Sequence, residues 1–189
     1  MSRFGQVACA ALIGSVLVGC AGGSYVRPVY VRNPGGLIDP IRSLSYAAGQ
    51  GGMLTEVHGN PFNAPQEEVN RAVTETLESS HFGPQLPFFT TPPDGHSSAY
   101  RVVVLFSPAP GAAASKLCED SNQPTAERPG FVDVMVAYCS NDTRLTSTQG
   151  SVAGAMGPND PAFRDLMSEI GLVLFPPRIP DPNDGDFDS

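Results

Sequence analysis

The segment from Tyr100 to Phe106 constrains the fold most, because it is apolar on both faces apart from Arg101. A strand with apolar side chains on both faces is expected at the centre of a sheet, covered on two sides, or at least on a well-buried face. A chain of 189 residues has the usual length of one domain, so we expect a single core around this strand.

Five further segments carry the period of a strand or a helix. Alternation of apolar or β-branched residues between turn residues predicts strands over Met53–Val57, Phe131–Tyr138 and Arg144–Val152. Apolar residues at helical spacing predict helices over Ala64–His81 and from Asp160 to about Phe175. In the second helix, Asp160 would cap the first turn and Pro161 would occupy the first helical position.

The order of these elements is strand, helix, three strands, helix. It predicts an α+β fold in which two helices cover one face of a small mixed, mostly antiparallel sheet. The last three strands would form an antiparallel meander. The first strand would reach Tyr100–Phe106 through the first helix, as a parallel crossover.

The first 19 residues have the parts of a signal peptide, with Arg3 before an apolar run from Val7 to Val18. This run is shorter than the roughly 20 residues of a transmembrane helix. Directly after it, Leu17-Val18-Gly19-Cys20 resembles the lipobox of bacterial lipoproteins. The resemblance implies cleavage before Cys20, a diacylglycerol on its thiol and, usually, an acyl chain on the new amino group. A plain secretory signal with an incidental cysteine is the alternative.

The residue after the lipobox bears on the destination of the protein. In Gram-negative lipoproteins an Asp at that place commonly retains the protein at the inner membrane, and this chain has Ala21. The resemblance therefore implies the outer membrane, facing the periplasm, with the lipid as the contact to the membrane. From Gly52 to Pro176 the chain also resembles a family of uncharacterised Gram-negative lipoproteins, through segments such as Met53–Phe62 and Arg101–Phe106. No activity comes with that resemblance.

Four regions are predicted along the chain: a leader over residues 1–19, a flexible tether over 20–50, a single domain over 51–176 and an acidic disordered tail over 177–189. The tether is predicted because Gly and Pro interrupt it and it has no helical period. Its repeated Tyr-Val-Arg leaves open a short strand or a partner-binding strip. The tail has four aspartates and too little apolar content to fold.

The charge of the chain argues against nucleic acid as a partner. Its formal net charge is −8, and loss of Arg3 with the leader makes it one unit more negative. Binding of nucleic acid needs clustered Lys and Arg to neutralise phosphates, and this chain has Lys116 and scattered arginines.

Of the four cysteines, Cys9 would be removed with the leader and Cys20 would carry the lipid. Cys118 and Cys139 remain. In an oxidising periplasm such a pair most often forms a disulfide, which here would close the long loop between two neighbouring strands. Two free thiols or a redox pair are the alternatives. The spacing is far from the Cys-x-x-Cys that redox chemistry usually uses.

Three polar residues in the predicted strands are candidate site residues: Glu56, His58 and Asp133. Glu56 and His58 share a strand face, and such a pair can bind a metal or act as acid and base. No second histidine stands at ligand spacing, so no metal and no cofactor is predicted. Asp133, an acidic residue in an apolar strand, either faces solvent or marks a site.

The sequence carries none of the motifs of serine hydrolases, zinc proteases or P-loop nucleotide binding that we searched for. It therefore predicts a non-catalytic binding or envelope-assembly module, with an envelope protein as its possible partner. A small-ligand or glycan-binding lipoprotein is the second hypothesis, and a hydrolase that uses Glu56 and His58 is the third.

Overall fold

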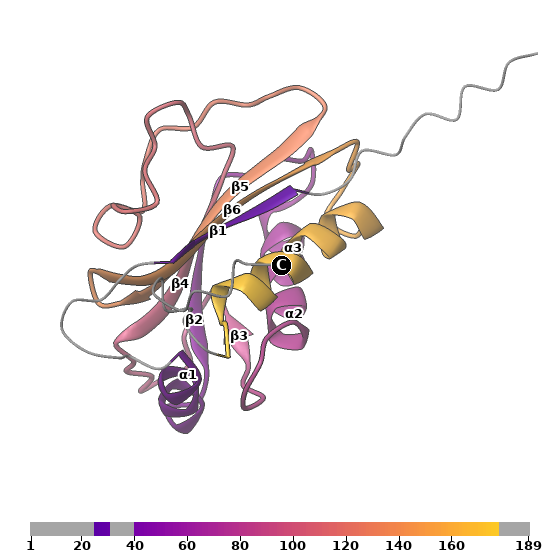
Figure 1. Ribbon diagram of the computed structural model, residues 1–189. Helices are drawn as coiled ribbons and strands as arrows, with labels where there is room; N and C mark the ends of the chain where they lie inside the picture. Colours follow the sequence, from indigo (N-terminus) through magenta and orange to yellow (C-terminus); the bar gives the residue numbers. More distant parts are fainter. Residues whose placement is uncertain (1–24, 31–39, 178–189) are drawn as a thin grey trace, which may run out of the picture.

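The computed structural model describes residues 25–30 and 40–177 (Figure 1). Within them, one mixed sheet of six strands has the order β1-β6-β5-β4-β2-β3. The strands are β1 (Tyr25–Tyr30), β2 (Met53–His58), β3 (Phe88–Phe89), β4 (Tyr100–Phe106), β5 (Phe131–Ser140) and β6 (Thr143–Ala153). The helices are α1 (Pro40–Gly49), α2 (Gln66–Ser79) and α3 (Pro161–Leu174).

The predicted α+β class is confirmed by this arrangement. Strands β4, β5 and β6 form the antiparallel meander, and β2 lies parallel to β4 after the crossover through α2. Helix α3 begins as predicted, because the Asp160 carboxylate accepts a hydrogen bond from the N–H of Ala162 at 2.9 Å.

Helices α2 and α3 cover one face of the sheet, as the sequence predicts (Figure 1). Alternate residues of β4 point toward them, because successive side chains of a strand point to opposite faces. The cluster that results is the larger of the two cores, and it includes Val102, Val104, Phe106, Val73, Leu77, Phe163 and Ile170.

The opposite face is covered by the irregular segment of residues 107–130, which connects β4 to β5 and which we call the covering segment. Leu117 and Cys118 of this segment pack against Val103 and Leu105 of β4 in a second, smaller core. Strand β4 is therefore buried on both faces, which confirms the expectation that Tyr100–Phe106 is a central strand.

The tether predicted over residues 20–50 is wrong for two parts of that range. Strand β1 pairs antiparallel with β6, from Tyr25 opposite Ser151 to Tyr30 opposite Thr146. Helix α1 buries Leu44 in the larger core. The folded domain therefore begins at residue 25 rather than 51. The leader, Cys20, the rest of the tether and the tail beyond Pro177 lie outside the described residues.

Gly171 marks the closest approach of α3 to the end of α2. A Cβ at this position would overlap the backbone carbonyl oxygen of Ser80, which cannot rotate away. Alanine in a helix interior normally stabilises by about 1 kcal/mol relative to glycine. We expect Gly171→Ala to do the reverse and to lower the free energy of unfolding by about 1–3 kcal/mol, measured by urea unfolding.

Gly157→Ala is the control for this prediction, because a Cβ there would meet nothing within 4 Å. It should change the free energy of unfolding by less than about 0.5 kcal/mol. An equal or greater stability of Gly171→Ala relative to the parent chain would contradict the close approach of the two helices.

Candidate functional site

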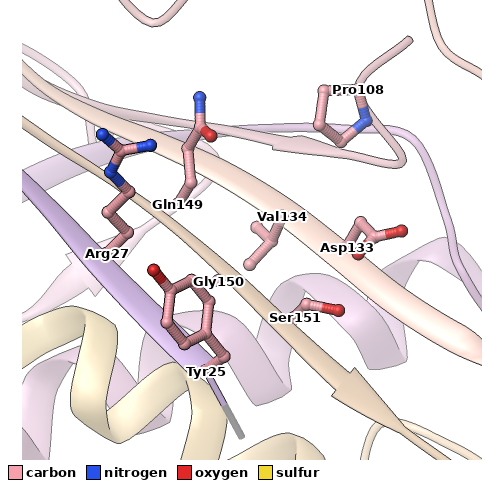
Figure 2. Close-up of a pocket in the computed structure, with 8 residues that line it drawn as sticks. All are labelled: Tyr25, Arg27, Pro108, Asp133, Val134, Gln149, Gly150 and Ser151. Carbon is pink, nitrogen blue, oxygen red and sulfur yellow. The ribbon is translucent and has the colours of Figure 1, made fainter. Parts of the chain in front are cut away.

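The covering segment leaves a groove open on its face of the sheet, over β5, β6 and β1 (Figure 2). The groove has a volume of about 300 Å³ and continues beneath the covering segment into a second space of about 500 Å³. Pro108, Asp133 and Gln149 line both spaces. We call the first space the β1 groove; its lining is Tyr25, Arg27, Pro108, Asp133, Val134, Gln149, Gly150 and Ser151.

Strand register brings the polar lining of the β1 groove together. Tyr25 of β1 lies opposite Ser151 of β6, which in turn lies opposite Asp133 of β5. The next row toward the other end of the sheet pairs Arg27 with Gln149. Figure 2 shows the side chains of Arg27 and Gln149 extending the same way from neighbouring strands. An aromatic ring, a guanidinium, an amide, a hydroxyl and a carboxylate thus share one surface.

Asp133 both lines the β1 groove and holds the end of the covering segment. The Nε of Arg128 donates to its Oδ2 at 2.8 Å, and the Nη2 of Arg128 donates to Ser151 Oγ at 2.7 Å. The guanidinium also lies over the ring of Phe131, with 3.7 Å between Cζ and the ring centroid. Asp133 therefore faces solvent only in part, because its carboxylate forms an ion pair with Arg128 at the rim of the groove.

This ion pair predicts a pH dependence. Hydrogen bonding to Arg128 lowers the pKa of Asp133 below its ordinary value of 3.8. Stability from this shift is present above the ordinary pKa and is lost as the pH falls through the folded value. We expect Asp133→Asn to be slightly less stable than the parent chain at pH 7 and equal to it in strong acid, as measured by urea unfolding. Arg128→Met should lose the same pH-dependent part and, in addition, a part that remains in acid, because its contacts with Ser151 and Phe131 do not depend on the Asp133 charge. A pH-independent difference for Asp133→Asn would contradict the ion pair.

Glu56 and His58 lie on the same sheet face as the β1 groove, but on the far side of the covering segment. His58 Nε2 is 3.8 Å from Glu56 Oε2, so the two residues share a face as predicted. The closer partner of Glu56 is Arg101, whose Nε lies 3.1 Å from Oε1. Glu56 thus belongs to an ion pair with Arg101, and the sequence reasoning missed that arginine.

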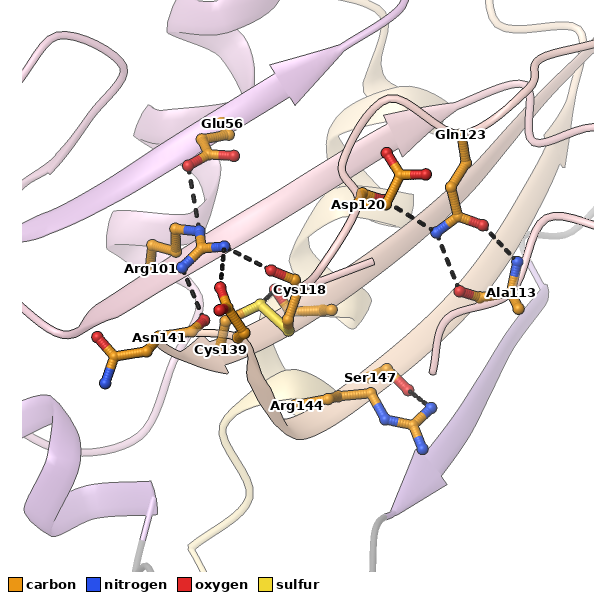
Figure 3. The surroundings of a disulfide bond; sticks show 12 residues. Glu56, Arg101, Ala113, Cys118, Asp120, Gln123, Cys139, Asn141, Arg144 and Ser147 are labelled. Carbon is orange, nitrogen blue, oxygen red and sulfur yellow. Dashed lines mark hydrogen bonds and ion pairs between the residues drawn. A yellow bond between two sulfur atoms is a disulfide. The ribbon is translucent and has the colours of Figure 1, made fainter. Parts of the chain in front are cut away.

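Arg101 ties three parts of the chain together beside the disulfide (Figure 3). Its Nη2 donates to the carbonyl oxygen of Cys118 at 2.6 Å, and its Nη1 donates to that of Asn141 at 2.7 Å. The Glu56 carboxylate forms an ion pair with the same guanidinium. The arginine therefore fixes the covering segment to β4 and to the turn between β5 and β6.

The predicted disulfide between Cys118 and Cys139 is confirmed. Both residues are almost completely buried, with exposed fractions of 1% and 0%. Gln123 adds a further restraint, because its amide accepts from the N–H of Ala113 at 2.7 Å and donates to the carbonyl of Ala113 at 3.1 Å. The covering segment is held at the disulfide, at Gln123 and at Arg128, so the wall of the groove is fixed without helix or strand.

The other two histidines lie apart from Glu56 and His58. His81 is buried against Phe88 and Phe175, and its Nδ1 is 3.2 Å from the carbonyl oxygen of Phe82. His96 has its Nδ1 3.1 Å from the carbonyl oxygen of Gln50. Across residues 25–30 and 40–177, no three His, Cys, Asp or Glu side chains are grouped to hold a metal ion. No helix of that part is long and apolar enough to span a bilayer.

The sequence reasoning named Asp133 but missed the rest of the groove. The repeated Tyr-Val-Arg was the available signal, since its alternation places Tyr25 and Arg27 on one face of a strand. Gln149 and Ser151 lie in a run of Thr and Ser that indicates a half-exposed strand, and nothing local distinguishes them from their neighbours.

No protein-family model and no curated protein matches this chain. Among solved structures, it is similar to the PelC dodecamer from Paraburkholderia phytofirmans in space group P6, with 14% identity and a TM-score of 0.44. A leucine-to-methionine variant of that dodecamer, in space group C2, gives 12% identity and a TM-score of 0.43. Both alignments cover 80% of this chain and 97% of the other.

Proposed function

We propose that this chain is a lipoprotein of the bacterial outer membrane, facing the periplasm, that binds a partner rather than catalysing a reaction. The lipid is carried by Cys20 after removal of residues 1–19, and Ala21 favours the outer membrane. At least two acyl chains are needed for a stable anchor, and the lipobox chemistry supplies them.

The disulfide is the observation that supports a periplasmic location. Cys118 and Cys139 lie in the smaller core, where the bond holds the covering segment on the sheet. Structural disulfides persist in oxidising compartments such as the periplasm and are rare in the cytosol. A fold that depends on this bond fits an exported protein.

The β1 groove supports a role in binding. Its wall is fixed by the disulfide and by the hydrogen bonds of Gln123, and its floor belongs to a six-stranded sheet. Recognition is favoured where polar groups are held in place before the partner arrives, because less conformational entropy is lost on binding. The partner we expect is an envelope protein.

Fatty-acid labelling in cells tests the anchor. Radioactive palmitate should label the parent chain and should not label Cys20→Ala, because the thiol that carries the lipid is missing. Cys9→Ala is the matched control, since Cys9 lies in the same leader, and it should keep the label. An unlabelled parent chain, or a labelled Cys20→Ala chain, would refute the lipoprotein.

Photo-crosslinking in cells tests the partner. A photoreactive residue in place of Gln149, which is exposed in the β1 groove, should give one discrete crosslinked band. The control places it at Glu78, an exposed residue of α2 on the opposite face of the sheet. Equal crosslinking from both positions, or none from Gln149, would count against a binding role of the groove.

A small ligand or glycan is the second candidate, and the lining of the β1 groove favours it. Tyr25 is 65% exposed, and Arg27, Gln149 and Asp133 offer planar polar groups beside it in the same lining. Ligand sites typically combine an aromatic surface with a small number of polar groups held in fixed positions. Native mass spectrometry of the protein released from detergent should then detect a bound small molecule, and Tyr25→Ala should lose it. If the parent chain carries no bound small molecule, this second candidate is refuted and the envelope protein stays the proposed partner.

A further inference from the structure

Six large apolar side chains are strongly exposed among the described residues, and they fall into two groups. The first group is Tyr25, Phe131 and Met156, with exposed fractions of 65%, 42% and 86%. Tyr25 begins β1, Phe131 begins β5, and Met156 follows the end of β6. These three points lie at one end of the sheet (Figure 1), which we call the β1 end.

Strand register confirms that the β1 end is one surface. Tyr25 lies opposite Ser151, and Phe131 lies opposite Ala153, two residues further along β6. Met156 comes three residues later, and its N–H donates to the Asp160 carboxylate at 3.0 Å, which holds the turn before α3. The three side chains therefore project from β1 and β5, the strands on either side of β6, and from the turn that follows β6.

The second group, Tyr46, Phe82 and Leu172, lies at the opposite end, which we call the α1 end. Tyr46 packs against Tyr100 at the start of β4, with 5.7 Å between the ring centroids. Phe82 follows the end of α2, and Leu172 lies in the last turn of α3. The molecule thus exposes apolar side chains at both ends of its long axis.

The distance from the anchor distinguishes the two ends. Four residues, 21–24, separate Cys20 from Tyr25, so the two Cα atoms are at most about 18 Å apart. Strand β6 has 11 residues and spans about 35 Å. A lipid on Cys20 therefore keeps the β1 end near the bilayer, and an upright domain holds the α1 end well away from it.

The side chains at the β1 end suit the boundary between water and lipid. Aromatic residues concentrate at that boundary, where a ring can enter the headgroup region. Arg128 lies over the Phe131 ring and is half exposed, but its Nε and Nη2 are bonded to Asp133 and Ser151, so the apolar side chains rather than this cation suit the boundary. The net charge of −8 opposes strongly anionic surfaces, so the matching surface is zwitterionic.

We propose that the β1 end docks on a zwitterionic phospholipid bilayer, with Tyr25, Phe131 and Met156 in the headgroup region. This rests on the lipid anchor proposed above. Docking fixes the orientation that a lipid alone leaves free. The β1 groove, which Tyr25 also lines, then opens close to the membrane, and the α1 end faces the periplasm.

The chain contains no tryptophan, so a single introduced tryptophan is an unambiguous fluorescent reporter. Phe131→Trp and Met156→Trp report on the β1 end, and Phe82→Trp, which replaces a side chain 47% exposed, reports on the α1 end as the matched control. Each full-length lipidated protein is placed in vesicles of phosphatidylethanolamine and phosphatidylcholine, with and without brominated acyl chains. Far-ultraviolet circular dichroism verifies that each variant is folded.

Brominated lipid should quench Phe131→Trp and Met156→Trp several-fold more than Phe82→Trp, with emission shifted to the blue at the β1 end alone. Met156 is so exposed that its substitution disturbs little packing, which keeps the test valid if Phe131→Trp folds poorly. Lipidated protein that is unquenched at both positions of the β1 end, or quenched equally at Phe82→Trp, would overturn the docking. Intact mass separates the two proposals, because a chain without lipid mass would refute the anchor itself.

Discussion

Replacing Cys118 and Cys139 together by alanine is expected to lower the free energy of unfolding by about 3 kcal/mol. The two cysteines are 21 residues apart, and a crosslink across a loop of that length removes conformational entropy from the unfolded chain. The bond also fixes the covering segment, which has no helix or strand to hold it. Loss of the bond should therefore expose the smaller core around Val103 and Leu105.

Urea unfolding of the purified protein measures the loss, and hydrogen exchange locates it. Residues 107–130 should exchange faster, whereas α2 and α3 on the opposite face should keep their protection. Cys139→Ala alone should lose as much stability as the double variant, because either change removes the whole bond. Parent protein treated with reductant should match both, and a loss below about 1 kcal/mol would contradict the structural role of the disulfide.

Arg101→Met is expected to cost about 1–3 kcal/mol, because it removes two hydrogen bonds and an ion pair and leaves the carbonyl of the buried Cys118 unsatisfied. The Arg101 side chain is 20% exposed and serves the carbonyls of Cys118 and Asn141 together with the Glu56 carboxylate. Methionine keeps the aliphatic volume, so the variant reports on the lost hydrogen bonds rather than on a cavity.

Arg144→Met is the matched control for this prediction. Arg144 and Arg101 lie on either side of Cys139 in the sheet, and the Nη1 of Arg144 donates a longer bond, 3.3 Å, to Ser147. Burial lowers the pKa of Arg144, which means that its cation is poorly solvated. We expect Arg144→Met to change the free energy of unfolding by less than about 1 kcal/mol. Equal losses for the two variants would show that Arg101 has no special role.

Residues with a strong local period were predicted correctly from the sequence. Val102 to Leu105 form a continuous apolar run, which predicts a central strand. The burial of β4 on both faces confirms that prediction. Asp160 and Pro161 mark the start of α3 because a cap and a first-turn proline have a local cause. The disulfide was predictable because the predicted leader and lipobox account for Cys9 and Cys20, which leaves Cys118 and Cys139.

Strand β1 could not be predicted with the same certainty, because its partner is far away in the sequence. Pro28 lacks an N–H and argues against a central strand, but an edge strand tolerates it. The hydroxyl of Thr148 in β6 adds a bond between the two strands, because it donates to the carbonyl of Arg27 at 3.1 Å. The contact joins residues 121 positions apart. Only the folded sheet shows that residues 25–30 form a strand.

The candidate site shows the same limit. Asp133 was noticed because a charge interrupts an apolar strand, but its partner Arg128 belongs to an irregular segment with no pattern. Glu56 and His58 share a face as their spacing predicts, yet Arg101 reaches Glu56 from the neighbouring strand. Spacing within one strand predicts which residues share a face, and the pairing of strands decides which of them meet.

The intact mass of the protein extracted from bacterial membranes tests the central claim most directly. We expect a chain that begins at Cys20, carries the mass of a diacylglycerol and an acyl chain, and has Cys118 and Cys139 resistant to alkylation without reductant. A chain that keeps residues 1–19, or one that begins elsewhere without lipid mass, would contradict a lipid-anchored protein of the cell envelope.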